Sequence, residues 1–358
     1  MGQTLLDRRR AAPQPMVDIR FGTSYELLLS ISAYQAPELV GAPDVVPPSF
    51  LAVPKTLPRA IREAVDRVGL GPMWQNFVGF AATDPVASDI PSLIRKVEAT
   101  SAFDVRLTAL GARSPAFRAV VDPGIFTDAA QGDANARAEL VERFAKSPRE
   151  RVEFTKLLTL KAGETKRAIV DVLRLWHREV LAPRESQVQE VLRRDVTSKL
   201  SHRKRVPAET LIEIATNGLE YRPERWAKRV LLIPQLSWRP WNVLLDHQDV
   251  SIICYPVADE SLGMDRDEPP ASLVRFHQAL GDDKRLRILK RLAEGSATLQ
   301  ELAAVANLAK SSAHHHLVLL RSAGLVRTTT EEQGRYTLRR DQITNMSAQL
   351  EQFLRGIE

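Results

Sequence analysis

Apolar residues recur at helical spacing along most of the first 217 positions. Starting from Ile169, for example, they fall at i, i+3, i+4, i+7 and i+11, which places them on one face of an amphipathic helix. The helical pattern begins near Val17. It predicts helices at 57–69, 90–100, 114–121, 136–146, 148–160, 163–181, 184–200 and 207–217.

The pattern changes after Arg222. Three runs rich in Val, Ile, Leu and aromatic residues follow, and such runs are typical of strands: RVLLIPQLSW, WNVLLD and VSIICYPV. Residues 246–249 fit a turn between the second run and the third. We therefore expect a small antiparallel sheet near 229–256.

Breaks in composition divide the chain into four parts. Residues 1–16 are polar with three consecutive arginines, and we expect a flexible tail there. Residues 17–258 carry the helical pattern and the sheet, and the acidic stretch 259–271, with its Gly and Pro, is typical of a linker. A compact C-terminal module of helices follows at 272–358.

Composition favours a cytoplasmic protein without a membrane partner. No run of residues approaches the roughly 18 apolar positions of a membrane helix, and the N-terminus has no secretory signal. The single cysteine, Cys254, excludes an internal disulfide and a cysteine-based zinc site. Because Cys254 lies in an apolar strand, we expect it to be buried and inert.

Positive charge is concentrated at the C-terminal end. The chain carries a net charge of +6, which permits a nucleic-acid partner without establishing one. Residues 272–358 hold 13 Lys/Arg against 9 Asp/Glu, whereas the other 271 residues hold 37 against 35. The module at 272–358 is therefore the part best suited to DNA.

This module contains a compact set of helix start and stop signals. Thr298 and Glu301 form a capping box, and Gly324 ends a helix that begins near Ala309. The predicted order is that of a winged helix-turn-helix domain: helices at 272–280, 282–294, 298–306 and 309–323, a hairpin at 325–340, and a helix at 341–356.

The segments LGDDKRLRILKRLAEG, TLQELAAVANLAKSSAHHHLVLLRSAGLV and QGRY resemble the ArsR-type family of bacterial transcriptional regulators over residues 272–340. The resemblance implies a recognition helix, 309–323, in the major groove and a wing, 325–340, on the flanking backbone or minor groove. Two departures stand out. Ala309 replaces the usual Ser/Thr cap, and ELAAVANL lacks the Cys-x-Cys pair of metal-sensing members, which excludes metal sensing through that site.

The predicted fold class is mainly α. A large helical N-terminal region with a small antiparallel sheet is followed by a C-terminal winged helix-turn-helix domain. We expect the last helix, 341–356, to form part of a homodimer interface, because its apolar stripe needs a partner.

Three consecutive histidines lie within the predicted recognition helix. Adjacent residues diverge by about 100° on a helix, so they cannot chelate one ion together; helical metal sites use i, i+3 or i+4 spacing. His314 and His315 fall opposite the apolar face, whereas His316 lies at the edge of the core and matches a structural histidine of the family. No nucleophile or orienting carboxylate is near in sequence, so we predict neither a metal nor a catalytic centre.

The same helix and the wing supply the candidate DNA-binding residues. Ser and His side chains can bond base edges or phosphates, and basic residues can contact phosphates. Arg335 resembles the wing arginine of the family. The alternatives are a solvated helix face for the two outward histidines and ordinary surface charges for the basic residues. The predicted set is Lys310, Ser311, Ser312, His314, His315, Arg321 and Arg335.

The N-terminal region has a plain interpretation as a regulatory or dimer-supporting domain. An effector pocket is left open, and four tryptophans are candidates to line it, although core packing is favoured for them. The basic stretch 193–205 could touch DNA, or it could be a solvated helix end. The four tryptophans are Trp176, Trp226, Trp238 and Trp241.

The sequence as a whole predicts a homodimeric, sequence-specific regulator of transcription, a repressor, whose partner is double-stranded DNA. We expect no cofactor and no enzymatic activity, because GxGxxG, GxxxxGK[ST], HExxH and GxSxG are all absent. Two alternatives stay open. One is an enzyme localised by its C-terminal module, and the other is a protein-interaction module whose winged helix no longer reads DNA.

Overall fold

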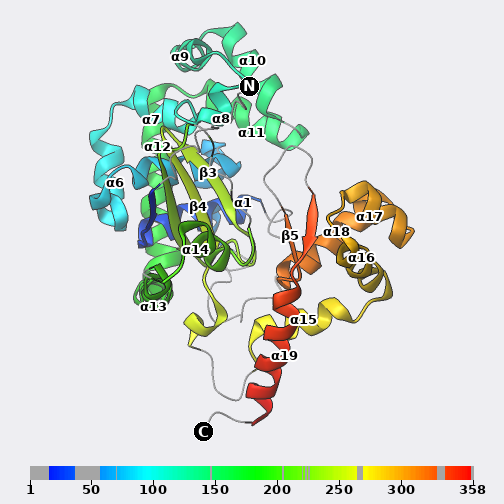
Figure 1. Cartoon of the computed structure of the whole chain (residues 1–358). Coiled ribbons are helices and arrows are strands. Elements are labelled where there is room, and N and C mark those ends of the chain that lie inside the picture. Colours follow the sequence, from blue (N-terminus) through cyan, green and yellow to red (C-terminus); the bar gives the residue numbers. More distant parts are fainter. Residues whose placement is uncertain are drawn as a thin grey trace, which may run out of the picture.

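The computed structural model has two parts, an N-terminal region up to residue 263 and a winged module from residue 269 onward (Figure 1). The predicted tail, except for Met16, lies outside the described residues. None of the helices in the described part of the chain is both long and apolar enough to cross a membrane. The structure describes residues 16–36, 57–69, 71–145, 147–203, 205–219, 221, 224, 226–263, 269–328 and 335–355.

A four-stranded sheet lies within the N-terminal region. Strands β1, β2 and β4 run parallel, and only β3 pairs antiparallel, with β4. The predicted antiparallel sheet is therefore correct for the β3–β4 hairpin and wrong for the rest. The strands are β1 (Met16–Ile19), β2 (Arg229–Gln235), β3 (Val243–His247) and β4 (Val250–Pro256), in the spatial order β1-β2-β4-β3.

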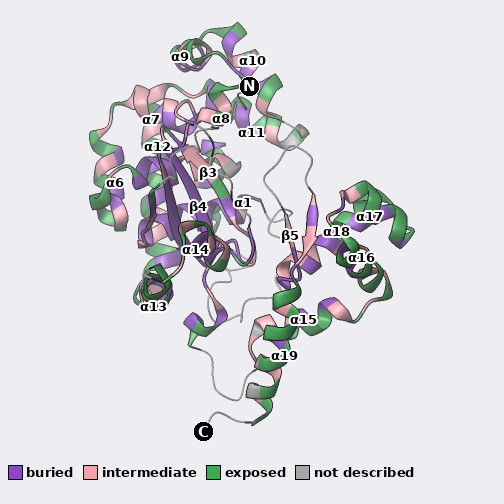
Figure 2. Cartoon of the chain, viewed as in Figure 1, coloured by how far each residue is buried: buried purple, intermediate pink, exposed green. Residues whose placement is uncertain are grey.

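The parallel pairing follows from burial of the sheet on both faces (Figure 2). Along β2, Leu231 and Ile233 pack into one helical layer, whereas Val230 and Leu232 pack into the other. Strands covered on both sides are apolar without polar alternation, which is the pattern of parallel strands. Val17, where a helical pattern was expected to begin, instead pairs with Val230 in β1.

The larger layer of helices packs around α1 (Thr23–Gln35), which is buried around nearly its whole circumference. Helix α12 (Ala162–Trp176) packs against α1, α4, α6 and α7. The other helices of this part are α4 (Arg59–Val68), α5 (Asn76–Ala82), α6 (Ile90–Ala99), α7 (Ala102–Ala109), α8 (Pro115–Arg118), α9 (Pro123–Gln131), α10 (Ala134–Phe144) and α11 (Pro148–Thr159), with 3-10 turns η1 (Gly71–Gln75) and η2 (Pro85–Ser88).

The opposite face of the sheet is covered by α13 (Glu185–Arg203) and α14 (Ala208–Ala215), which contribute Val196 and Leu211 to a second core. A π-helical turn, η3 (His177–Leu181), and a 3-10 turn, η4 (Ala182–Arg184), join α12 to α13. Cys254 is fully buried, as expected, and burial raises the pKa of its thiol.

The winged module has the predicted order of elements, and the mainly α fold class with a C-terminal winged helix-turn-helix domain is confirmed. The capping box of Thr298 and Glu301 is present, and Asn307 and Gly324 adopt the left-handed conformation at the ends of two helices. The elements are α15 (Ala271–Leu280), α16 (Asp283–Glu294), α17 (Leu299–Ala306), α18 (Lys310–Ser322), β5 (Val326–Thr328), β6 (Tyr336–Leu338) and α19 (Arg340–Arg355).

Candidate nucleic-acid interface

Helix α18, the predicted recognition helix, has one buried face and one exposed face. Ala313, Leu317 and Leu320 are buried, and the two leucines belong to the core of the winged module. The exposed residues lie in the N-terminal half of the helix and comprise Lys310, Ser311, Ser312, His314 and His315. The structure therefore brings five of the seven predicted residues together on one polar surface.

His316 lies at the edge of the core, as expected. Its Nδ1 is 3.7 Å from Oδ1 of Asp282, the residue that caps α16. Asp282 accepts a hydrogen bond from the backbone amide of Arg285, and this bond, with the charges of Arg285 and His316, lowers the pKa of the carboxyl. His316 thus lies beside the start of α16. No group of three potential metal ligands occurs among the described residues.

Arg335 lies at the base of the wing, immediately before β6. Its Nε donates to Oγ of Ser296 at 3.1 Å, and its Nη2 donates to the carbonyl oxygen of Ser296 at 2.9 Å. The next residue, Ala297, forms a β-bridge with Tyr336. Arg335 therefore holds the strand β6 against the segment that precedes α17, in addition to any contact with a ligand.

Arg321, the remaining candidate, is only partly exposed and faces the N-terminal region. Its Cζ lies 5.9 Å from the centroid of the Trp241 ring, and burial lowers the pKa of its guanidinium. Trp241 belongs to the loop 236–242, which joins β2 to β3. The C-terminal end of the recognition helix is thus packed against the N-terminal region, whereas its N-terminal half is exposed.

Two further contacts join the module to α14 and the turn that follows it. Arg327 of β5 forms an ion pair with Glu213 at 3.0 Å. Arg339, which is buried, donates from Nη1 to Oδ1 of Asn217 at 2.9 Å and packs against Gly218. Any Cβ at Gly218 would lie within 3 Å of the Arg339 side chain, so a larger residue there would displace it.

A buried carboxylate makes a fourth contact. Asp259 pairs with Arg239 of the loop 236–242 and with Arg275 of α15, and it accepts a bond from the backbone amide of Ser272. Burial acts to raise the pKa of Asp259, but the charges of Arg275 and Arg239 outweigh it, so the pKa is lowered. The predicted linker therefore begins with the ordered turn η5 (Asp259–Leu262).

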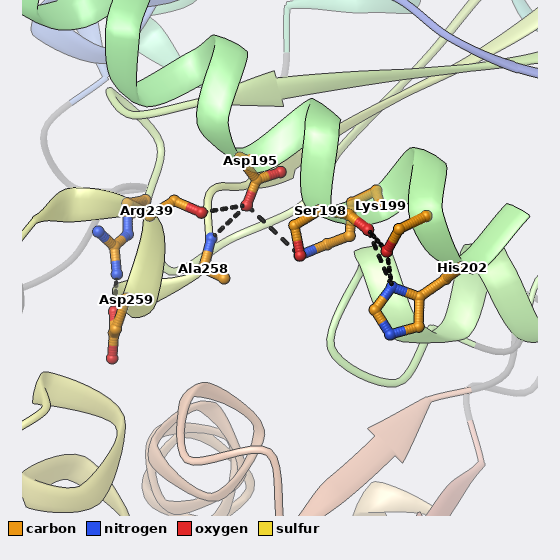
Figure 3. A network of polar contacts seen from close by, with 9 residues as sticks. Asp195, Ser198, Lys199, His202, Arg239, Ala258 and Asp259 are labelled. Atoms are coloured by element: carbon orange, nitrogen blue, oxygen red, sulfur yellow. Dashed lines mark hydrogen bonds and ion pairs between the residues drawn. The ribbon is translucent and has the colours of Figure 1, made fainter. Parts of the chain in front are cut away.

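Helix α13 fixes the same segment from the other side (Figure 3). Oδ1 of the buried Asp195 accepts bonds from the amide of Ala258 at 2.8 Å and from Oγ of Ser261 at 3.2 Å. The basic stretch of this helix makes its ion pairs within the N-terminal region, Arg193 with Glu190 and Arg203 with Asp18. These pairs favour the interpretation of a solvated helix.

Sequence reasoning missed the residues that join the two parts of the chain. Trp238 and Trp176 are buried in the core, as favoured, but the partly exposed Trp241 contacts the recognition helix. Asp259 was placed in a linker because the stretch around it is acidic. No local pattern marks either contact, because each joins residues from separate segments of the sequence.

Comparison with known proteins supports the assignment of the winged module. A helix-turn-helix domain family matches residues 280–329. Among solved structures, the chain is similar to an ArsR family transcriptional regulator, with 32% sequence identity over 22% of this chain and 89% of that one, and a TM-score of 0.21. None of the curated proteins is detectably similar. The family match shows that the winged module contains a helix-turn-helix domain.

Proposed function

We propose that this chain is a homodimeric, sequence-specific DNA-binding regulator of transcription that acts as a repressor. Helix α18 enters the major groove, and the wing lies on the flanking backbone or minor groove. The observation that carries the proposal is the exposed polar half of α18, which lies in a helix-turn-helix domain.

The chemistry of this surface suits a duplex. Ser311 and Ser312 are small enough to let the helix approach base edges, and both histidines of the exposed face can donate or accept hydrogen bonds. Lys310 supplies positive charge beside them. The N-cap residue Ala309 offers no side-chain acceptor, so the first backbone N–H groups of α18 are left for phosphate oxygens.

In this proposal, helices α15 and α19 form the interface with a second copy of the chain. These helices pack against each other, and each exposes apolar side chains: Val274 on α15, and Ile343 and Leu354 on α19. Met346, by contrast, is buried within the module itself. A homodimer formed through this face would present two recognition helices to half-sites one helical turn apart.

The N-terminal region acts in this proposal through binding and not through a chemical step. Its contacts with the module, at Trp241, Asn217 and Asp259, allow a change in the N-terminal region to reach the recognition helix. An effector that binds this region would therefore modulate the affinity for DNA.

The test begins with the full-length protein and fragmented genomic DNA from the host. Retained fragments are sequenced, and the enriched site is titrated at several salt concentrations. We expect a palindromic site and a steep loss of affinity with salt. His315→Ala should weaken binding to this site, whereas the matched variant His202→Ala, at an exposed histidine of α13, should not.

No enrichment over random DNA, together with a shallow salt dependence, would contradict the proposal. The winged helix would then be a protein-interaction module. An unchanged affinity in His315→Ala would reject the assignment of the recognition surface, even if the chain binds DNA.

A further inference from the structure

The N-terminal region contains a cavity of about 360 Å³. It lies between α5 with its preceding turn η1, the short helix α8, the end of α10, helix α11 and the edge strand β3. None of the four tryptophans considered as pocket residues lines it. The volume is at the lower end of the range of small-molecule sites, about 300 to 1,000 Å³.

Aromatic side chains form one wall of the cavity. The rings of Phe117 and Phe144 lie 4.6 Å apart, and those of Phe144 and Phe154 lie 6.5 Å apart. Leu244 of β3 also lines the cavity, and it is half exposed although it is apolar. These side chains suit a ligand with an apolar body.

The polar part of the lining consists of three carboxylates and the neutral side chains of Gln75, Asn76 and Ser114. Asp246 of β3 accepts bonds from Oγ of Ser114 at 2.9 Å and from the amide of Ala116 at 2.7 Å, and both donors are neutral. Glu150 and Glu153 of α11 also line the cavity, but both have other partners, for Glu150 the backbone amide of Ser147 among them, so Asp246 is the carboxylate on which the charge argument rests. A carboxylate beside aromatic rings favours a cationic group, which gains from both.

We propose that this cavity binds a small amphipathic cation, an aromatic or aliphatic body with an ammonium-type head, and that this ligand is the effector that releases DNA. The effector role rests on the proposed regulatory function. The binding of the cation does not, because it is argued from the lining of the cavity alone.

Strand β3 connects the cavity to the recognition helix. Leu244, Leu245 and Asp246 line the cavity, and Trp241, which contacts Arg321 of α18, precedes Leu244 by only three residues. A separation of three residues spans at most about 11 Å even in a fully extended chain. A ligand that moves or stiffens this strand therefore acts directly on the loop 236–242.

The same strand reaches the module by a second route. Nδ2 of Asn242 donates to the carbonyl oxygen of Thr216 at 2.8 Å, and the next residue, Asn217, binds Arg339. In the sheet order of the described residues, β3 lies at an edge and pairs with β4 alone. An edge strand has one hydrogen-bonded neighbour to disturb, so it shifts more readily than a central strand.

The test uses the full-length protein and three probes that share one body. Isothermal titration calorimetry at pH 7.5 compares 4-phenylbutylamine, 4-phenylbutan-1-ol and 4-phenylbutanoate, which are cationic, neutral and anionic. We expect the amine to bind at least about fivefold more tightly than the alcohol, and the carboxylate to bind most weakly.

Two matched variants locate the site. Leu244→Trp fills the cavity from its half-exposed wall and should abolish binding of the amine. Val152→Trp, at an exposed residue of α11 outside the lining, should bind as the wild type does. Thermal unfolding of both variants checks that they are folded.

A second measurement tests the coupling. Fluorescence anisotropy follows binding to the selected genomic site with saturating 4-phenylbutylamine, and ethylammonium chloride at the same concentration serves as the ionic-strength control. We expect at least about a fivefold loss of DNA affinity, which is the low end of allosteric coupling. The loss should disappear in Leu244→Trp.

Each outcome bears on a different part of the proposal. Equal binding of the three probes, binding of none, or undiminished binding by Leu244→Trp would overturn the ligand class or the site. Amine binding without any change in DNA affinity would overturn the effector role. A chain that binds the amine but no DNA would contradict the regulator and uphold the cavity as a cation site.

Discussion

The guanidinium of Arg321 lies over the indole ring of Trp241, with 5.9 Å between Cζ and the ring centroid. The first residue belongs to the recognition helix and the second to a loop of the N-terminal region. This pair ties the end of the helix to the rest of the chain and removes Arg321 from the exposed polar surface. The basic residues of this helix therefore have two roles. Lys310 is exposed on the proposed DNA-binding surface, whereas Arg321 contacts the N-terminal region.

The salt dependence of DNA binding should distinguish these roles. Lys310→Ala should reduce the slope of log K against log [salt] by about 1, because one phosphate contact is lost. Arg321→Ala should leave the slope unchanged, because its side chain packs on Trp241. Anisotropy titrations of both variants over a range of salt concentrations provide the comparison, and a reduced slope in Arg321→Ala would return this residue to the DNA interface.

The buried carboxylate of Asp259 should be important for stability. Asp259→Asn leaves the charges of Arg239 and Arg275 buried without compensation, so we expect a loss of about 3 to 5 kcal/mol in the free energy of unfolding. The control is Asp249→Asn, whose pair with Lys228 is exposed and should contribute less than about 1 kcal/mol. Urea unfolding monitored by tryptophan fluorescence measures both, and equal losses would be incompatible with the assigned role.

The order of elements in the winged module was predictable because each boundary carries a short-range signal. Thr298 and Glu301 cap one helix, and Asn307 and Gly324 provide the left-handed conformations that end two helices. The outward direction of His314 and His315 follows from the helical repeat alone. Each of these features depends on residues that lie within one or two helical turns of each other in the sequence.

Other features depend on contacts between distant segments. An apolar run such as VLLI predicts a strand but not the direction of its partner, so β1, β2 and β4 were not recognised as parallel. The packing of Arg321 on Trp241 and the convergence of Phe117, Phe144 and Leu244 around one cavity arise in the same way. In each case the residues that meet come from separate elements.

The dimer should depend on the exposed apolar residues of the last helix. Leu354, which is 72% exposed, and Ile343 should be at the interface, so the double variant Ile343→Glu/Leu354→Glu should raise the dimer dissociation constant at least about tenfold. Val86→Glu, at an equally exposed position of the N-terminal region, is the control. Sedimentation equilibrium measures the change, and a monomeric wild type at all accessible concentrations would reject the homodimer.

Stability should fall in mild acid because of His247, at the end of β3. Its side chain is buried against Gly79 of α5, and burial, with the charges of Arg113 and Lys96, lowers its pKa to about 4. In the unfolded chain the pKa returns to about 6.5. Between these values the unfolded state binds more protons than the folded state, so stability is lost as the pH falls from 6.5 towards 4.

From pH 7.5 to pH 5.0 this single histidine should remove about 2 kcal/mol from the free energy of unfolding. Carboxyl groups also begin to titrate near the lower end of this range, so the contribution of His247 has to be isolated by comparison. His247→Gln cannot take up the proton and should lose about 2 kcal/mol less than the wild type over the same interval. His202→Gln, at an exposed histidine, should behave as the wild type. Urea unfolding of the three proteins at both pH values gives the result, and an identical loss in wild type and His247→Gln would mean that the pKa of His247 is the same in the folded and unfolded states.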